Sequence, residues 1–137
     1  MRARDLKLFL CLQAIGVLWA TLLFSTFESR LVAGALAGGF FVISGLFMII
    51  RAYTWTGKWR SLCWYALLVH VFGISIPMVT MRFLQSGLGF ESVRIWGIEG
   101  PVFHRLSGMV FVILVTATLT DWWRTHKKAN GPRSAAR

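Results

Sequence analysis

The chain has few charged residues, and very few of those are acidic. Five aspartates and glutamates stand against fifteen lysines and arginines in 137 residues, and charged residues make up only 15% of the sequence. A soluble domain usually has about a quarter charged residues, so this composition, which is 56% hydrophobic, favours a membrane protein. A net charge of +10 would suggest nucleic-acid binding in a soluble protein. Here the basic residues lie between and after the apolar runs, so orientation in a bilayer explains them better, and we expect no nucleic-acid partner.

The motifs of the common enzyme classes are also missing. The two cysteines, Cys11 and Cys63, form no CxxC pair and have no metal-ligand spacing, so we interpret them as small buried hydrophobic residues. The sequence shows no paired carboxylates, zinc signature, nucleophile elbow or phosphate-binding loop. We therefore name no catalytic residue and no metal ligand, and nothing in the sequence favours an enzyme.

What the sequence does contain is four long apolar runs. Three are twenty residues long, Leu8–Phe27, Leu31–Ile50 and Leu62–Met81, and the fourth reaches spanning length as Val102–Trp123. About twenty apolar residues cross a bilayer core of about 30 Å, so each run predicts a transmembrane helix. The expected fold class is an all-α integral membrane protein, a four-helix transmembrane bundle. The first run is too long for a signal peptide, and we expect an uncleaved helix.

The basic residues divide unequally between the two sides of such a bundle. Eleven fall on one side, namely Arg2, Arg4, Lys7, Arg51, Lys58, Arg60, Arg124, Lys127, Lys128, Arg133 and Arg137. The other four are Arg30, Arg82, Arg94 and Arg105. The positive-inside rule then predicts that both termini face the cytoplasm and that the loop 85–101 faces outward. We expect residues 1–127 to form one four-span domain in a bacterial cytoplasmic (inner) membrane, with 128–137 as a flexible basic tail.

Small residues mark where the helices would pack, because close backbone approach drives helix association in lipid. The second run contains Gly34 and Gly38 as a GxxxG motif. The motif predicts packing within the bundle, and a homodimer contact is the alternative. In the third run Pro77 predicts a kink near Gly73, because its ring displaces the carbonyl four residues before it.

Two polar residues lie deep within the predicted spans, Gln13 in the first and His70 in the third. An ionisable residue inside a membrane is a functional candidate by default, although one hydrogen bond to a neighbouring helix would also satisfy a neutral histidine. Structural and functional roles for His70 both stay open. A haem shared by His70 and His104 is disfavoured, because antiparallel helices place the two about 15 Å apart in depth. The cofactor is therefore unknown.

A second polar group stands where the fourth run begins. The segment HRLSG, from His104 to Gly108, follows the turn Glu99-Gly100-Pro101. It resembles the His-Arg-x-Ser/Thr-Gly segment of the cytochrome b subunit of succinate dehydrogenases, which opens a helix beside the quinone site. The resemblance implies that Arg105 and Ser107 face a quinone. It covers five of the 137 residues and stands at the last predicted span, whereas in that family it opens the first.

The predicted outer loop, residues 85–101, retains large apolar residues, which are Phe90, Ile95, Trp96 and Ile98. Loops of this length with such residues are often ordered and functional. The loop is predicted either to anchor the protein at the membrane surface or to contact a ligand or partner. The candidate binding residues at this end are His104, Arg105, Ser107, Glu99, Trp96 and Arg82.

Three classes of function remain open from the sequence. The first is a small multi-pass membrane protein that acts by binding, as an accessory or assembly subunit of a membrane complex. The second is an oligomeric transporter or channel, against which stands the scarcity of deep ionisable residues. The third is a redox or quinone-contacting subunit that uses His104, Arg105 and Ser107. The expected partners are membrane lipid and either another membrane protein or further copies of this chain.

Overall fold

The computed structural model describes residues 3–56 and 62–129, with side chains described for 4–51 and 62–127. The long helices are α1 (Ala3–Thr26), α2 (Arg30–Thr56) and α5 (Gly100–Ala129). A further long helix is built from three consecutive segments, α3 (Leu62–Leu68), the π-helix η1 (Val69–Ser75) and α4 (Ile76–Leu84). The short elements are the 3-10 turn η2 (Phe90–Ser92) and the strands β1 (Arg94–Ile95) and β2 (Ile98–Glu99).

Four helical segments are long and apolar enough to cross a membrane, which confirms the prediction of an all-α bundle with four such helices. Their bounds are Arg4–Thr26, Arg30–Arg51, Leu62–Leu84 and Gly100–Lys127. Each coincides with one predicted apolar run to within a few residues at most ends. Helix α5 continues as far as Ala129, and the remainder of the predicted tail, residues 130–137, lies outside the described residues.

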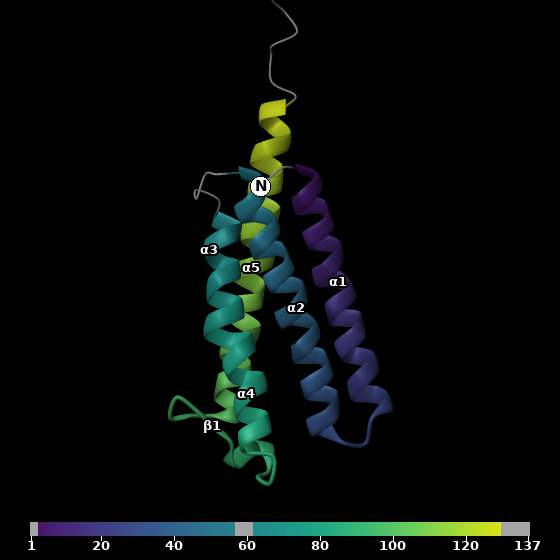
Figure 1. The fold of residues 1–137 in the computed structure, drawn as a ribbon, viewed down its shortest axis with the longest axis vertical. Coiled ribbons are helices and arrows are strands. Elements are labelled where there is room, and N and C mark those ends of the chain that lie inside the picture. The colour runs from purple at the N-terminus through teal and green to yellow at the C-terminus, as the bar shows by residue number, and fades with distance from the viewer. Residues whose placement is uncertain (1–2, 57–61, 130–137) are drawn as a thin grey trace, which may run out of the picture.

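Successive long helices run in opposite directions, and different elements lie at the two ends of the bundle (Figure 1). The start of α1 and the end of α5 lie at one end, which we call the termini end. The turn between α1 and α2 and the strands β1 and β2 lie at the opposite end, which we call the hairpin end. The turn spans only residues 27–29, and the Ser29 hydroxyl accepts a hydrogen bond from the Val32 N–H, which caps the start of α2.

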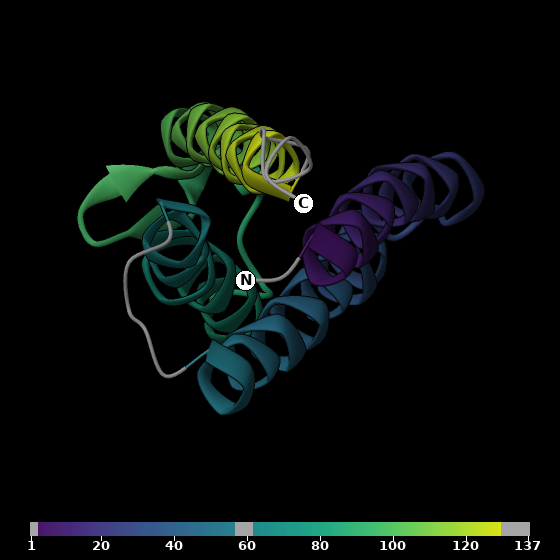
Figure 2. The same cartoon turned by 90° about the horizontal axis from the view of Figure 1, so that it is seen from above.

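The core joins all the long helices only toward the termini end. One buried cluster there combines Leu6 and Phe9 of α1, Met48 of α2, Cys63, Leu67 and Val71 of the third span, and Leu114 of α5. Toward the hairpin end the core divides into two clusters. Leu23, Ala33 and Ala37 join α1 to α2, whereas Ile74, Val93, Ile95 and Phe103 join the third span, the hairpin and α5. Figures 1 and 2 show the same division, because α1 diverges from α5 toward the hairpin end.

The third span is not a uniform α-helix. Between Val69 and Ser75 the backbone is a π-helix, and the N–H of Ile76 bonds to the carbonyl of Val71, five residues back. Pro77 follows directly and lacks an N–H that could bond within the helix. Pro77 predicted a kink near Gly73, and at that position the structure has a widened turn, which the sequence pattern did not indicate.

Three glycines lie at tight contacts between helices. A Cβ at Gly38 would collide with Val79 of α4, and a Cβ at Gly45 with Val71 of η1. At Gly16 of α1 a Cβ would lie 2.7 Å from the Phe41 ring of α2. At Gly34, the other member of the GxxxG motif, the atom nearest to an added Cβ would belong to the Phe24 ring, 3.8 Å away. Of the motif pair, only Gly38 sits at a tight contact within this chain.

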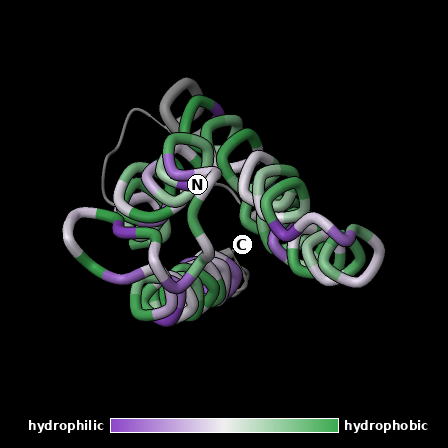
Figure 3. The backbone as a smooth tube through the Cα atoms, turned by 90° about the horizontal axis from the view of Figure 1, so that it is seen from below, coloured by the Kyte–Doolittle hydropathy of each residue, from purple (hydrophilic) through white to green (hydrophobic). Residues whose placement is uncertain are grey.

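The outward faces of the long helices are apolar. Leu18, Ile43 and Val112 are 70%, 71% and 63% exposed, and they lie on α1, α2 and α5 respectively. Viewed from the hairpin end, most of the helical backbone carries hydrophobic residues (Figure 3). An apolar surface of this extent needs an apolar environment to cover it.

Candidate functional site

The hairpin end is built around a tight turn. Strands β1 and β2 pair antiparallel, with Arg94 opposite Glu99 and Ile95 opposite Ile98. The two residues between them, Trp96 and Gly97, have φ angles of 53° and 81°. Two successive positive φ values define a type I′ turn, the geometry that matches the twist of a two-residue hairpin. Glycine accepts this conformation freely, but tryptophan does so only where its surroundings hold it.

The base of the hairpin is wedged into the bundle. Val93 and Ile95 are fully buried beside Ile74 and Phe103. The N–H of Gly100, at the start of α5, donates to the Val93 carbonyl at 2.8 Å. A side chain at Gly100 would collide with the backbone carbonyl of Phe90. The loop therefore has a defined structure, and Val93 and Ile95 are part of the core, with Ile98 packed against them.

Gln85 fixes the hairpin from the other side. Its amide nitrogen donates to the Arg94 carbonyl at 2.9 Å, and its oxygen accepts from the Arg94 N–H at 3.0 Å. The side chain thus pairs with one residue of β1 as a neighbouring strand would. Because β1 is an edge, this pairing satisfies backbone groups that would otherwise face solvent.

Three of the predicted site residues meet aromatic rings at this end. The guanidinium of Arg82 lies 4.9 Å from the centre of the Phe90 ring, and the His104 ring stands edge-to-face to the same ring at 6.1 Å. Trp96 is 65% exposed and touches Phe103 edge-to-face, with ring centres 6.1 Å apart. The hairpin end therefore presents a cation, an imidazole and an indole on a rigid frame.

The other predicted residues of this cluster do not converge. Glu99 lies opposite Arg94 in the hairpin and is exposed. With about 3.6 residues per turn, Arg105 and Ser107 project about 160° apart around α5. Among the described side chains, no ion pair joins His104 to Glu91 or Glu99.

A second polar group lies inside the bundle, toward the termini end. The Gln13 amide donates to the Thr118 hydroxyl at 3.3 Å, which connects α1 to α5. The Thr118 hydroxyl in turn donates to the Leu114 carbonyl and lies 3.3 Å from the Cys63 sulfur. One turn further along α5, the Asp121 carboxylate accepts from the Cys63 N–H at 2.8 Å, which satisfies a free donor in the first turn of α3. We call Gln13, Thr118, Cys63 and Asp121 the interior chain.

His70 lies deeper in the bundle, on η1. It is 5% exposed, and its ring packs against Phe41 of α2 and Phe111 of α5, with ring centres 6.1 Å and 5.8 Å away. His104 precedes Phe111 by about two turns of α5, about 10 Å along the helix. The two histidines therefore lie in separate environments, one among interior rings and one at the hairpin end.

Sequence reasoning missed the acidic residues of this interior. Asp5 is only 3% exposed and pairs with Arg51 of α2, Oδ1 to Nε, at 2.8 Å. Asp5 and Asp121 stand near the ends of predicted spans, where their position alone marks them as unusual in a membrane helix. Their partners are 46 and 58 residues away, so only the fold reveals them.

Neither region has the composition of a metal site. In the part of the chain that the structure describes, no group of three His, Cys, Asp or Glu side chains could hold a metal ion. Comparisons of the chain with protein-family models, with curated proteins and with solved structures found no match.

Proposed function

We propose that this chain is an integral membrane protein that crosses the bilayer four times, with both termini in the cytoplasm and the hairpin end outside. Four helices have the length and hydropathy for it, and their apolar outer faces need a lipid cover. By their order in the sequence, eleven of the fifteen basic residues fall on the same side of the four spans as the termini, which is the cytoplasmic side under the positive-inside rule. At that end Lys127 lies 5.3 Å from the Trp123 ring, a pairing that suits the headgroup region.

We further propose that the protein acts by binding, as an accessory or assembly subunit of a membrane complex, and that the hairpin end is its contact surface. The single observation that carries this proposal is Trp96. It is 65% exposed at the tip of a hairpin whose base is fully buried. Exposed tryptophan and arginine on a rigid frame are the residues that most often dominate binding energy at interfaces, and rigidity lowers the entropic cost of association.

Of the alternatives, the quinone-contacting subunit has less support. Arg105 and Ser107 project from opposite sides of α5, so one small ring could not touch both. For the hairpin end itself, the alternative role is a plain membrane anchor, in which Trp96 sits among lipid headgroups. The two readings differ in what Trp96 touches.

Site-specific photo-crosslinking in intact cells tests this difference. A photoreactive amino acid is placed at position 96, and a matched control places it at Met109 on α5, which is also 65% exposed. We expect a discrete protein adduct from position 96 and none from position 109. An adduct with a second copy of this chain would identify a homo-oligomer, and an adduct with another membrane protein would identify the partner. Lipid adducts alone from both positions would contradict the proposal and support the anchor.

A further inference from the structure

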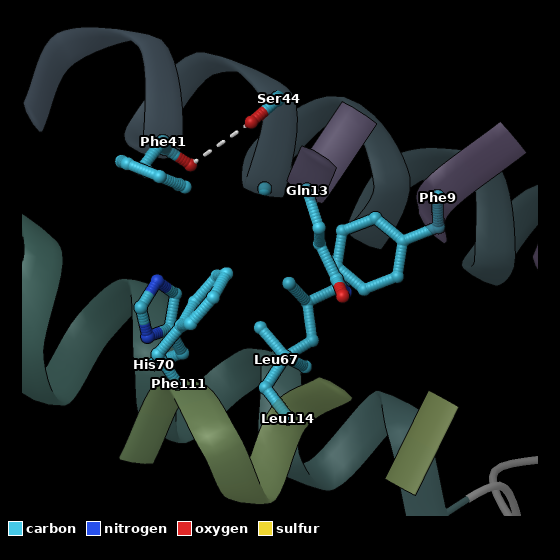
Figure 4. Close-up of a pocket in the computed structure, with 9 residues that line it drawn as sticks. Phe9, Gln13, Phe41, Ser44, Leu67, His70, Phe111 and Leu114 are labelled. Atoms are coloured by element: carbon cyan, nitrogen blue, oxygen red, sulfur yellow. Dashed lines mark hydrogen bonds between the residues drawn. The ribbon is translucent and has the colours of Figure 1, made fainter. Parts of the chain in front are cut away.

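The charged residues of this chain lie toward the ends of the bundle and not in its middle. A small cavity between α1, α2, η1 and α5 is lined by apolar residues together with Gln13, Ser44 and His70 (Figure 4). None of the described Asp, Glu, Lys or Arg side chains lines it. A charged ligand therefore has no oppositely charged partner there, and the charges at the two ends are what such a ligand would meet.

The two ends differ in net charge. By their order in the sequence, eleven basic and two acidic residues fall on the side of the termini, whereas four basic and three acidic residues fall on the other side. The first set has a net charge of +9 and the second of +1, which together make the +10 of the chain. Electrostatic attraction of an anion is therefore strong only at the termini end.

The two acidic residues on this side are both engaged within the bundle. Asp5 is only 3% exposed and pairs with Arg51, Oδ1 to Nε, at 2.8 Å. Asp121 is half-buried and accepts a hydrogen bond from the Cys63 N–H at 2.8 Å, at the start of α3. Both carboxylates thus serve groups of the bundle itself, and they leave the basic side chains at the surface without a counter-charge.

Four of these basic side chains, which we call the basic rim, are exposed at the termini end. Arg4 and Lys7 lie on α1, and Arg124 and Lys127 lie on α5. Among the described side chains, none of the four forms an ion pair. The two members of each pair are three residues apart, so they share a face of their helix and repel each other. Arg4 also stands in the first turn of α1, where the helix dipole disfavours a cation.

We propose that the basic rim binds the headgroups of anionic phospholipids. Leu6 and Trp122 pack in one apolar cluster, which holds the start of α1 beside the end of α5. The rim therefore lies at the ends of two apolar helices, at the depth where headgroup phosphates lie when such helices cross a bilayer. Trp123 is 60% exposed with Lys127 5.3 Å from its ring, and tryptophan is enriched at this depth. The inference rests on the proposed insertion in a bilayer and is independent of binding at the hairpin end.

Native mass spectrometry of the full chain, released from nanodiscs with equal amounts of phosphatidylglycerol and phosphatidylcholine, tests the proposal. The measured quantity is the ratio of the two lipids that stay bound. One basic residue near an anionic surface is worth about a fivefold preference, so we expect phosphatidylglycerol to be retained at least about fivefold over phosphatidylcholine. Arg4→Gln with Lys7→Gln, and separately Arg124→Gln with Lys127→Gln, should each lower this ratio by at least about half.

The matched control is Arg30→Gln with Arg105→Gln, which removes the same charge at the hairpin end and should leave the ratio unchanged. Equal retention of the two lipids by the wild-type chain would overturn the proposal. A preference that neither rim variant lowers, or that the control lowers as much, would also overturn it. Either rim variant that stays folded is sufficient for the decision.

A separate arm adds single-stranded RNA to the chain in nanodiscs of phosphatidylcholine alone. RNA binding together with equal retention of the two lipids would assign the basic rim to nucleic acid instead. No outcome depends on the adduct at position 96, so a failure here is distinct from a failure of the proposed binding at the hairpin end.

Discussion

The two glutamines of this chain make contacts of opposite kinds. Gln13 is buried and bonds to a side chain of another long helix, 105 residues away. Gln85 is half-buried and bonds to the backbone of Arg94, nine residues away. The first contact fixes how helices pack, and the second fixes the shape of one loop. The comparison indicates that the interior chain stabilises the bundle, whereas the exposed tip of the hairpin presents a surface and contributes little to global stability.

The largest difference in the free energy of unfolding is expected between variants of the buried Asp5 and of the exposed Glu99. Asp5→Asn removes a carboxylate charge whose side chain is only 5% exposed and which pairs with Arg51, and should lower the free energy of unfolding by about 2–3 kcal/mol. The exposed Glu99→Gln at the hairpin end should change it by less than about 0.5 kcal/mol. Unfolding titrations in mixed micelles measure both. An equal loss in the two variants would remove the distinction between the regions.

A smaller effect, and a local one, is expected at the base of the hairpin. Gly100→Ala forces a methyl group against the Phe90 carbonyl and should cost about 1–2 kcal/mol. Because the collision is with the hairpin, hydrogen exchange should rise at the Val93–Ile98 amides and stay unchanged in α1 and α2. The control is Gly108→Ala on the same helix, where a methyl group meets nothing within 4 Å. Equal exchange in both variants would show that the hairpin is not wedged as described.

The interior chain should show a still smaller, global effect. Thr118 and Thr120 both donate to the carbonyl four residues back on α5, but only Thr118 also accepts from Gln13. Thr118→Val should therefore cost about 0.6–1.7 kcal/mol, the range of hydrogen bonds between membrane helices. Thr120→Val should cost less, as measured in the same titrations. A larger loss for Thr120→Val would mean that the bond between α1 and α5 does not stabilise the bundle.

The sequence predicts the helices well because twenty-residue apolar runs have few alternatives. The hairpin is harder to predict, although in Arg94-Ile95-Trp96-Gly97-Ile98-Glu99 a charged and an apolar residue stand on each side of the Trp-Gly turn. Asn-Gly or Asp-Gly would have signalled its turn, and tryptophan at a positive φ does not. The π-helix before Pro77 has no pattern of its own, since a proline in a helix is as compatible with a simple kink.

The site was predicted only in part, for a reason that the residues make clear. Chain position alone places His104, Arg82 and Trp96 near the adjoining ends of the third and fourth predicted spans, and their role in binding stays a prediction. Arg82 and His104 both contact the Phe90 ring, and Trp96 contacts the Phe103 ring, only because of the way the hairpin folds. Asp5 with Arg51, and Asp121 with Cys63, are contacts between distant segments, which a single sequence does not reveal.

The smallest expected effect on stability is that of Trp96→Ala. Crosslinking in this variant tests most directly the central claim, that the hairpin end binds a partner and the interior chain stabilises the bundle. The photoreactive residue is placed at Leu88, which is 50% exposed in the same loop, in two backgrounds, Trp96→Ala and Thr118→Val. We predict that Trp96→Ala abolishes the partner adduct with a change in unfolding free energy below about 0.5 kcal/mol, whereas Thr118→Val keeps the adduct and lowers stability. If the adduct still forms in Trp96→Ala, the hairpin end is not the binding surface. If the adduct is lost in a folded Thr118→Val protein, the interior chain contributes to binding as well as to stability. Either result would contradict the account.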